Sequence, residues 1–250
     1  MKDKFYGFIA GFIYCDSSIN TKKRGYSDNV AIFLAIMDCF TRQEVSPLSI
    51  MQEIERCYEE KNKYLYSSAV SHNTVKPSLA IALRKFKISG EVVPSTNMDM
   101  SADVIFRGII PPLLQRFTNL ANADVIVSLT HGAPMTMYYI IFITDFCKLI
   151  FDGVQKKGLQ KFANGRGFIN EILDIPVHCN SSIEIGETIR QALHMFFITD
   201  GVVDVKTNQM SNGLYGMFAG SYYGFKYLHE NNLVKIDADI MDLIGRNYSD

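Results

Sequence analysis

Apolar residues recur along most of this chain with the three-to-four-residue period of an α-helix. The segment DNVAIFLAIMDCFTR, residues 28–42, shows the pattern most clearly, and its apolar stripe predicts one buried helix face. That stripe consists of Val30, Leu34, Met37 and Phe40. A second segment, residues 46–64, opens with Ser46 as a helix cap and Pro47 in the first turn, which strongly favours a helix start.

The same period predicts further helices, and strand patterns are few. The expected helices span residues 78–86, 103–117, 134–157, 182–199 and 237–248. The best alternating stretch is GEVVPS, residues 90–95, and it is short. Breaks in the helical pattern at 92–101, 162–167 and 201–213 are too short to link independent domains. These patterns predict an all-α fold in which residues 1–250 form one compact domain.

A predicted helix near the C-terminus carries several glycines on one side. In SNGLYGMFAGSYYG, residues 211–224, glycines stand at positions 213, 216, 220 and 224. Each interior glycine costs about 1 kcal/mol relative to alanine, so the stripe predicts a very close approach of a second backbone. The N-terminal helix, with Gly7 and Gly11 four residues apart, is the expected partner. This packing would bring residues 207–210 towards Ser27 and Asp28.

Composition and charge narrow the functional classes. The 250 residues carry a net charge of -1, with 48% apolar and 20% charged residues, so we expect no nucleic-acid or anionic-membrane partner. The apolar stretch 135–151 holds Asp145 in its interior and is expected to be too short for a membrane span. The apolar N-terminal run lies between Asp3 and Asp16 and lacks a small-residue cleavage site, which predicts a core helix and not a signal peptide.

The five cysteines show neither a CxxC pair nor metal-finger spacing. They are Cys15, Cys39, Cys57, Cys147 and Cys179. An odd number scattered through apolar segments suits a reducing compartment, where each thiol is expected to be buried as a small apolar group. We therefore expect a cytoplasmic protein.

No short motif identifies a catalytic centre. The chain lacks the patterns GxxxxGK, HExxH and GxSxG. A histidine–cysteine nucleophile pair remains open, although no local signature supports one. The available histidines are His72, His131, His178, His194 and His229. Asp237 and Asp239 could hold a metal, but acids are also expected at the start of an amphipathic helix because they complement its dipole.

Four short segments place polar groups at helix ends. The first ends the N-terminal helix at Asp16, and the second caps a long apolar helix with Ser27, Asp28 and Asn29. The third is a Thr-His-Gly turn before the helix that begins at Pro134. The fourth is the polar run that leads into the glycine-striped helix.

Taken in order, these segments resemble the ADP-ribosylhydrolase family of dinitrogenase reductase-activating glycohydrolases. Family members begin with a pattern like GALLGLAVGDALG, which corresponds here to residues 7–18 with Asp16 at the shared aspartate. A TDDT-type turn follows, where this chain has residues 27–30. Arg107 falls at the arginine of a segment similar to NGAAMRVAPLGLL.

The later family segments are similar as well. A THGDP-like turn corresponds to Thr130, His131, Gly132 and Pro134, with Ala133 in place of the acid. In the family, a GGDTDT turn runs into AxxGALAGAYYG, and YGMFAGSYYG, residues 215–224, is similar to its second part. The resemblance spans residues 7–229 in the right order and implies an all-α ADP-ribosylhydrolase-like fold.

The resemblance implies a metal site that this chain has altered. In the family, two magnesium ions lie among the TDD turn and a late DxD[TS] turn and orient the ribose of an ADP-ribosylated substrate. Here Asn29 replaces one early acid, the late acids fall at Thr207 and Gln209, and Met210 replaces the hydroxyl. A carboxylate about 4 Å from a unit charge contributes roughly 4 kcal/mol at an effective dielectric near 20. Three lost acids therefore predict no tight two-magnesium site, and Asp28 remains a weak candidate ligand.

The connection between the first two family segments is also short. Eleven residues separate Asp16 from Asp28, and none is a glutamate, whereas active relatives bring in a catalytic glutamate there. A different alignment would make Asp204 one surviving acid of the late turn.

The resemblance and its departures together imply a pseudoenzyme without a cofactor. It is expected to bind an ADP-ribose-type small molecule or a protein partner such as an ADP-ribosyltransferase, in an immunity or regulatory role. The residues expected to bind the ligand are Asp16, Ser27, Asn29, Arg107, Thr130, His131, Gly132, Thr207, Asn208 and Gln209.

Two alternatives to this reading stay open. One is an active, magnesium-assisted ADP-ribosyl glycohydrolase with Asp28 as its catalytic group, and the other is a purely structural protein. Structural roles also remain for single residues. Ser27 and Asp28 would be caps, Arg107 would be the partner of Asp103, His131 would be a hydrogen-bonded turn histidine, and Asp16 would end its helix and bond loop amides.

Overall fold

The computed structural model describes most of the chain, in nine segments. These are residues 1–17, 27–43, 45–59, 77–115, 121–166, 184–203, 208–234, 236 and 238–248. Within them every regular element is a helix, and the one β-type contact is an isolated bridge between Ser101 and Glu184. The predicted all-α fold is therefore confirmed.

The helices vary in length from single turns to 18 residues. In chain order they are α1 (Lys2–Ser17), α2 (Asp28–Thr41), α3 (Pro47–Glu59), α4 (Pro77–Ser89), the 3-10 helix η2 (Ala102–Val104), α5 (Ile105–Gly108), α6 (Ile110–Leu114), α7 (Ala121–Ser128), α8 (Pro134–Phe151), α9 (Lys156–Gly165), α10 (Ile185–Ile198), α11 (Gln209–Tyr223), α12 (Phe225–Glu230) and α13 (Ala238–Asn247).

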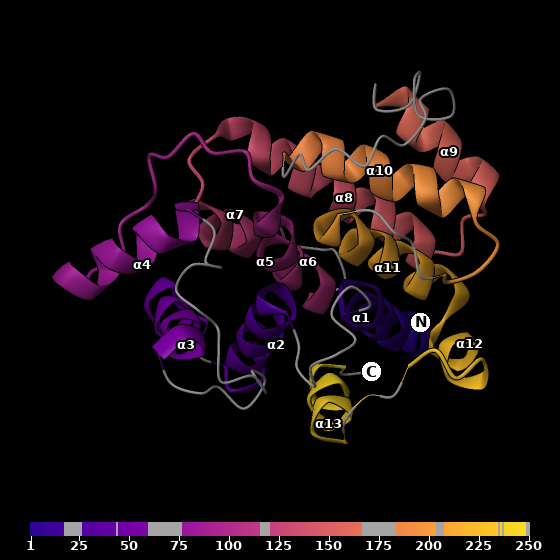
Figure 1. Ribbon diagram of the computed structural model, residues 1–250, viewed down its shortest axis with the longest axis horizontal. Coiled ribbons are helices and arrows are strands. Elements are labelled where there is room, and N and C mark those ends of the chain that lie inside the picture. Colours follow the sequence, from indigo (N-terminus) through magenta and orange to yellow (C-terminus); the bar gives the residue numbers. More distant parts are fainter. Residues whose placement is uncertain are drawn as a thin grey trace.

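The first and eleventh helices form the centre of the fold. Figure 1 shows α1 and α11 side by side in the middle of the molecule, although they come from opposite ends of the chain. α11 also packs against α8 and α10, while α2 packs against α3 and α13 on the other side. The C-terminal end of α1 and the N-terminal ends of α2 and α11 are therefore set by one packed core.

Glycines allow the close approach of α1 and α11. An added Cβ at Gly7 would collide with the carbonyl oxygen of Gly220, and one at Gly11 would collide with that of Gly216. The collisions are mutual, because a Cβ at Gly216 or Gly220 would strike the backbone of α1. The close backbone contact predicted from the glycine stripe is confirmed. Gly224, however, lies just beyond α11 and ends it with a φ of 89°.

An aromatic cluster fixes α1 against α2 and α5. The ring of Phe12 stacks on Phe106 with centroids 4.7 Å apart and meets Phe33 edge-on at 5.2 Å. All three rings are buried. Gly213 on α11 leaves room for them, since its Cβ would lie 3.0 Å from the Phe12 ring. Such ring pairs contribute about 0.5–1.5 kcal/mol each beyond their buried area.

Two predicted helices are divided in the structure. The segment 134–157 breaks between α8 and α9, where Gly153 takes a φ of 84° that favours glycine. The segment 103–117 is divided among η2, α5 and α6, with the second break at Ile109. Pro111 and Pro112 supply no amide hydrogen, so the helical ladder loses two donors there.

The structure corrects the sequence-based view of α8. By length and composition alone this 18-residue helix is long and apolar enough to cross a membrane. The sequence pattern had predicted that residues 135–151 are too short to do so. Buried core helices pass the same test, and 44% of α8 is buried inside the protein.

The described cysteines behave as expected. Cys15, Cys39, Cys57 and Cys147 are free and buried, which confirms their interpretation as small apolar groups. Cys179 lies outside the described residues.

Candidate functional site

The ends of three helices meet around Asp16. This carboxyl group, in the last turn of α1, is 2% exposed. The Ser27 hydroxyl, just before α2, donates a hydrogen bond to Asp16 Oδ2. The Gln209 amide, in the first turn of α11, donates to the same oxygen at 3.3 Å. The predicted approach of the start of α11 to Ser27 is thus confirmed at Gln209.

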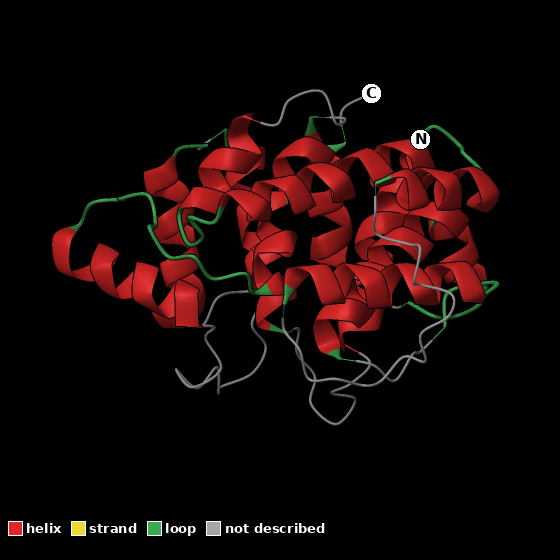
Figure 2. Cartoon of the chain, turned by 90° about the horizontal axis from the view of Figure 1, so that it is seen from above, coloured by secondary structure: helices red, strands yellow, loops and turns green. Residues whose placement is uncertain are grey.

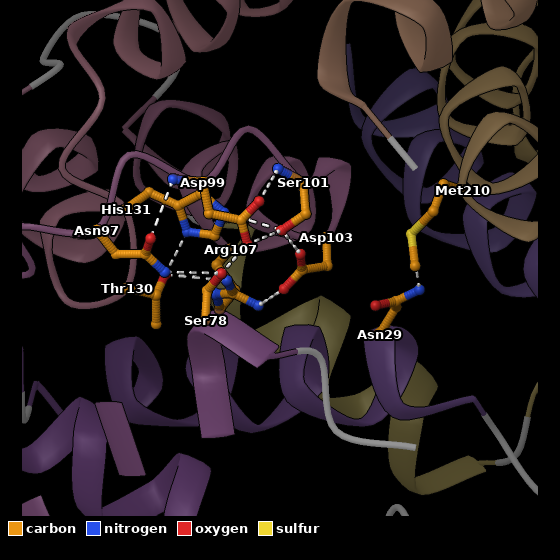
Figure 3. Close-up of polar contacts among 10 residues, drawn as sticks. All are labelled: Asn29, Ser78, Asn97, Asp99, Ser101, Asp103, Arg107, Thr130, His131 and Met210. Atoms are coloured by element: carbon orange, nitrogen blue, oxygen red, sulfur yellow. Dashed lines mark hydrogen bonds and ion pairs between the residues drawn. The ribbon is translucent and has the colours of Figure 1, made fainter. Parts of the chain in front are cut away.

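Ser27 and Asn29 connect this cluster to the start of α2. Ser27 caps the helix, because its Oγ accepts a 3.2 Å hydrogen bond from the amide of Val30. Asn29 is buried, and its amide Nδ2 lies 3.3 Å from the sulfur of Met210 on α11 (Figure 3). Two residues expected at the altered metal turns therefore contact each other directly. We refer to Asp16, Ser27, Asn29, Gln209 and Met210 as the aspartate cluster.

Burial makes Asp16 an unusual acid. It raises the pKa of this carboxyl to about 6, although hydrogen bonds from Ser27, Gln209 and Asn29 act in the opposite direction. The nearby charge of Asp28 raises it further. Asp16 Oδ1 is buried and has no hydrogen-bond partner among the residues that the structure describes. Asp16 therefore exchanges a proton not far below neutral pH.

Asn208 holds the beginning of α11 in place. Its side-chain oxygen accepts a 2.9 Å hydrogen bond from the amide of Ser211, as an N-cap does, and its Nδ2 donates to Gln191 Oε1 at 2.7 Å. The Ser211 hydroxyl donates to the same Gln191 oxygen at 2.7 Å. Gln191, on α10, was not recognised from the sequence because this contact is long-range. Thr207 and Asp204 lie outside the described residues.

A second buried cluster surrounds Arg107, and we call it the arginine network. Its guanidinium donates to Asp103 Oδ2 at 2.8 Å and to Thr130 Oγ1 at 3.1 Å. His131 Nδ1 lies 2.8 Å from Thr130 Oγ1, and its Nε2 lies 3.1 Å from Ser101 Oγ. Figure 3 shows these side chains converging, with Asn29 and Met210 as a separate pair. The predicted Arg107–Asp103 ion pair is confirmed, and it is buried.

Arg107 and Asp103 carry the charges of the arginine network, and its other members are neutral. Burial, followed by the charge of Arg107, lowers the pKa of His131 to about 4, so this histidine is neutral at neutral pH. Burial opposes ionisation of Asp103, but the charge of Arg107 and hydrogen bonds from Ser101 and Arg107 keep the pKa of this carboxyl below its usual range. Arg107 and Asp103 thus form one charged pair, and the neutral Thr130 and His131 complete its hydrogen bonds.

A series of polar turns supports this network. Ser95, Asn97 and Asp99 each accept a hydrogen bond from the backbone amide two residues later, at 3.1, 3.2 and 3.0 Å. Gly132 donates its amide to the Asn97 carbonyl at 2.7 Å, and an added Cβ at Gly132 would collide with the Ser95 carbonyl. The alternation of polar residues in STNMDMSAD, residues 95–103, could have revealed this ladder from the sequence.

Tyr58, on α3, is a further residue that the sequence did not identify. Burial raises the pKa of its hydroxyl, the charge of Asp28 raises it further, and Arg107 lowers it. Its hydroxyl is therefore within electrostatic reach of both Asp28, next to the aspartate cluster, and the arginine network. We find no sequence pattern that marks Tyr58.

The aspartate cluster does not fit two magnesium ions. Among the residues that the structure describes, no three of His, Cys, Asp and Glu come together as a metal site. The Asn29 amide faces the Met210 thioether, a soft ligand, whereas magnesium requires hard oxygen ligands in near-octahedral geometry. We therefore derive no reaction step through magnesium.

Comparison with solved structures supports the fold expected from the sequence. The chain is similar to a structure described as an "ADP-ribosylglycohydrolase-related protein complex", with a TM-score of 0.73. The alignment covers 99% of this chain and 97% of that chain, at 15% sequence identity. No family model and no curated protein matches the sequence. The chain thus has an ADP-ribosylglycohydrolase-like, all-α fold.

Proposed function

We propose that this protein binds an ADP-ribose-type ligand at the aspartate cluster and does so without magnesium. The observation that carries this proposal is that neutral side chains occupy the point where α2 and α11 begin. Asn29 contacts Met210 there, and Gln209 donates a hydrogen bond to Asp16. The ADP-ribosylglycohydrolase-like fold supports this proposal, and the side chains of the cluster favour hydrogen bonding over metal coordination.

The elements around the cluster suit a polyhydroxylated phosphate ester. Free amides at helix N-termini attract phosphate groups, and two helices, of 14 and 15 residues, begin here. Ser27, Asn29 and Gln209 offer neutral donors and acceptors that match sugar hydroxyls. The arginine network supports the site indirectly, because Thr130 and His131 are buried in hydrogen bonds that fix the turn before α8.

A protein partner fits the same proposal. A binder of this kind could hold an ADP-ribosyltransferase in an immunity or regulatory role, in the cytoplasm. The matched solved structure is itself described as a complex, which supports a role in protein association.

The raised pKa of Asp16 favours residual hydrolase activity as the second candidate. A carboxyl group that titrates near 6 is suited to general acid–base catalysis at neutral pH. Release of ADP-ribose from an ADP-ribosylated protein, lost in Asp16→Asn, would support this candidate over the pseudoenzyme.

Calorimetric titration with ADP-ribose tests the proposed site. We expect binding to the wild type and a loss of about tenfold in affinity, or about 1.4 kcal/mol, in Gln209→Leu. Gln52→Leu, at an exposed position on α3, serves as the matched control and should bind as the wild type does. Absence of binding to the wild type would reject the ligand proposal and favour a protein-binding or structural role.

A further inference from the structure

One face of α4 makes few contacts with the rest of the protein. Figures 1 and 2 show α4 at the outer edge of the molecule, where it packs mainly against α3. Of its 13 residues, Ser78, Leu79 and Phe86 are buried. Helices shorter than about 12–15 residues are marginal in water without tertiary packing, so α4 would gain stability from a second contact.

The exposed face of α4 combines apolar and cationic side chains. Ile81, Arg84, Lys85 and Ile88 follow the spacing i, i+3, i+4, i+7 and therefore share one side of the helix. Ile81 is 46% exposed and Ile88 is 81% exposed. Neither Arg84 nor Lys85 forms an ion pair with a residue that the structure describes. Two cations that have no ion-pair partner among the described residues thus lie between two exposed isoleucines.

A hollow next to this face offers a place for an apolar anchor. Ile81 and Lys85 line it from α4, Met51 from α3, and Val93 and Glu91 from the loop that follows. Its cavity volume is only about 20 Å³, and it opens to solvent. Sites for whole small molecules span about 300–1,000 Å³, so this hollow is too small for a nucleotide and suits the tip of one apolar side chain.

We propose that the face formed by Ile81, Arg84, Lys85 and Ile88 docks an acidic amphipathic helix of a partner protein. Apolar side chains of that helix would contact the two isoleucines, and the tip of one of them would enter the hollow. The carboxylates of the helix would pair with Arg84 and Lys85. An anionic membrane fits less well, because membrane-binding segments gather about 4–8 cations and Glu91 lies at the rim of this hollow. This docking face is separate from the aspartate cluster and does not depend on ligand binding there.

Fluorescence anisotropy with a synthetic helical peptide tests the docking face. The probe carries leucines at i, i+3, i+4 and i+7 flanked by glutamates, and a second peptide carries lysines in their place. We expect the glutamate peptide alone to bind, and Lys85→Glu and Ile88→Ser each to weaken binding at least about tenfold. Lys161→Glu on α9 and Ile198→Ser on α10, both exposed, are the matched controls and should leave binding unchanged.

Three results would overturn the docking proposal. They are equal binding of the two peptides, no binding of the glutamate peptide, and unaltered binding by the α4 variants. Vesicles of phosphatidylcholine and phosphatidylserine provide the alternative probe. Retention on these vesicles without binding of the glutamate peptide would assign the face to an anionic membrane and also overturn the proposal.

Discussion

Asp16 shows how a single buried residue sets the chemistry of the candidate site. Its Oδ2 accepts hydrogen bonds from the neutral groups of Ser27 and Gln209. Among the described residues, no cation contributes to the shift of its pKa. A carboxyl group in such surroundings resists ionisation because burial disfavours its charged form. The chemistry of this cluster therefore depends on the protonation state of one carboxyl group.

The stability of Asp16→Asn should depend on pH in a specific direction. The carboxyl group titrates near 3.8 without burial and near 6 in the folded protein, so the folded state holds the extra proton between these values. Ionisation of Asp16 then lowers the stability of the wild type by roughly 3 kcal/mol as pH rises from about 4 to about 6. The asparagine variant escapes this loss, so its stability relative to the wild type should rise across that range.

Urea unfolding at several pH values between about 4 and about 7 measures this difference. Asp239→Asn, at an exposed position on α13, is the matched control and should show no such trend. If the difference in unfolding free energy between Asp16→Asn and the wild type stays constant with pH, the raised pKa of Asp16 is wrong.

Removal of Arg107 should be far more costly than removal of a surface arginine. Arg107→Met leaves Asp103 buried and unpaired, which is expected to cost about 3–5 kcal/mol. Arg246→Met breaks an exposed ion pair with Asp242 and should cost less than about 1 kcal/mol. Asp103→Leu combined with Arg107→Met should recover part of the loss. Equal losses for the two single arginine variants in urea unfolding would refute a buried pair.

At the scale of elements, the contact between α1 and α11 holds the candidate site together. Gly220→Ala places a methyl group against the Gly7 carbonyl, so the helices must separate. We expect a loss of about 1–3 kcal/mol in unfolding free energy. Gly165→Ala, in the last turn of α9, meets no atom within 4 Å and should be neutral or gain up to about 1 kcal/mol. If thermal unfolding shows the two variants to be alike, the close contact is wrong.

The elements and their central contact could be predicted from the sequence, because local chemistry determines both. Helical periods defined α2, and the glycine stripe of α11 required a partner backbone, which the glycines of α1 identified. The division of 134–157 depended on the φ of Gly153, which periodicity does not reveal.

The side-chain partners in the site were harder to predict. The sequence marked Arg107 and His131, but their bonds to Ser101 and Thr130 depend on how separate loops pack. The alternating polar residues of 95–103 looked like a simple break because their side chains bond to their own backbone. The glycine stripe predicted that residues 207–210 approach the start of α2, but the specific pairing of Asn29 with Met210 depends on side-chain packing that the sequence does not reveal.

At the scale of the whole molecule, the buried groups His131 and Asp16 have opposite effects on folding stability as the pH falls. The pKa of His131 falls from 6.5 to about 4, so the unfolded chain takes up its proton first as pH falls. Neutral His131 therefore favours folding at higher pH, whereas protonated Asp16 favours folding at lower pH. Their contributions largely cancel between about pH 4 and about pH 6.

Replacing His131 should isolate its own pH-dependent contribution to stability. We expect His131→Gln to be less stable than the wild type at every pH because the variant disrupts the arginine network. The loss should be smallest near pH 4, because there the wild type is itself destabilised by keeping His131 neutral in the folded state. The difference in Tm from the wild type, measured by differential scanning calorimetry, should shrink as pH falls from about 6.5 to about 4. A difference that grows over this range would mean that His131 is charged in the folded protein.

The fold places an ADP-ribosylglycohydrolase-like architecture around a site whose described side chains bond to one another and do not gather metal ligands. Calorimetric titration of the wild type with ADP-ribose, first in EDTA and then in excess magnesium, tests this account most directly. We predict the same affinity in both solutions. Binding that appears only with magnesium, or that tightens more than about tenfold with it, would contradict the account.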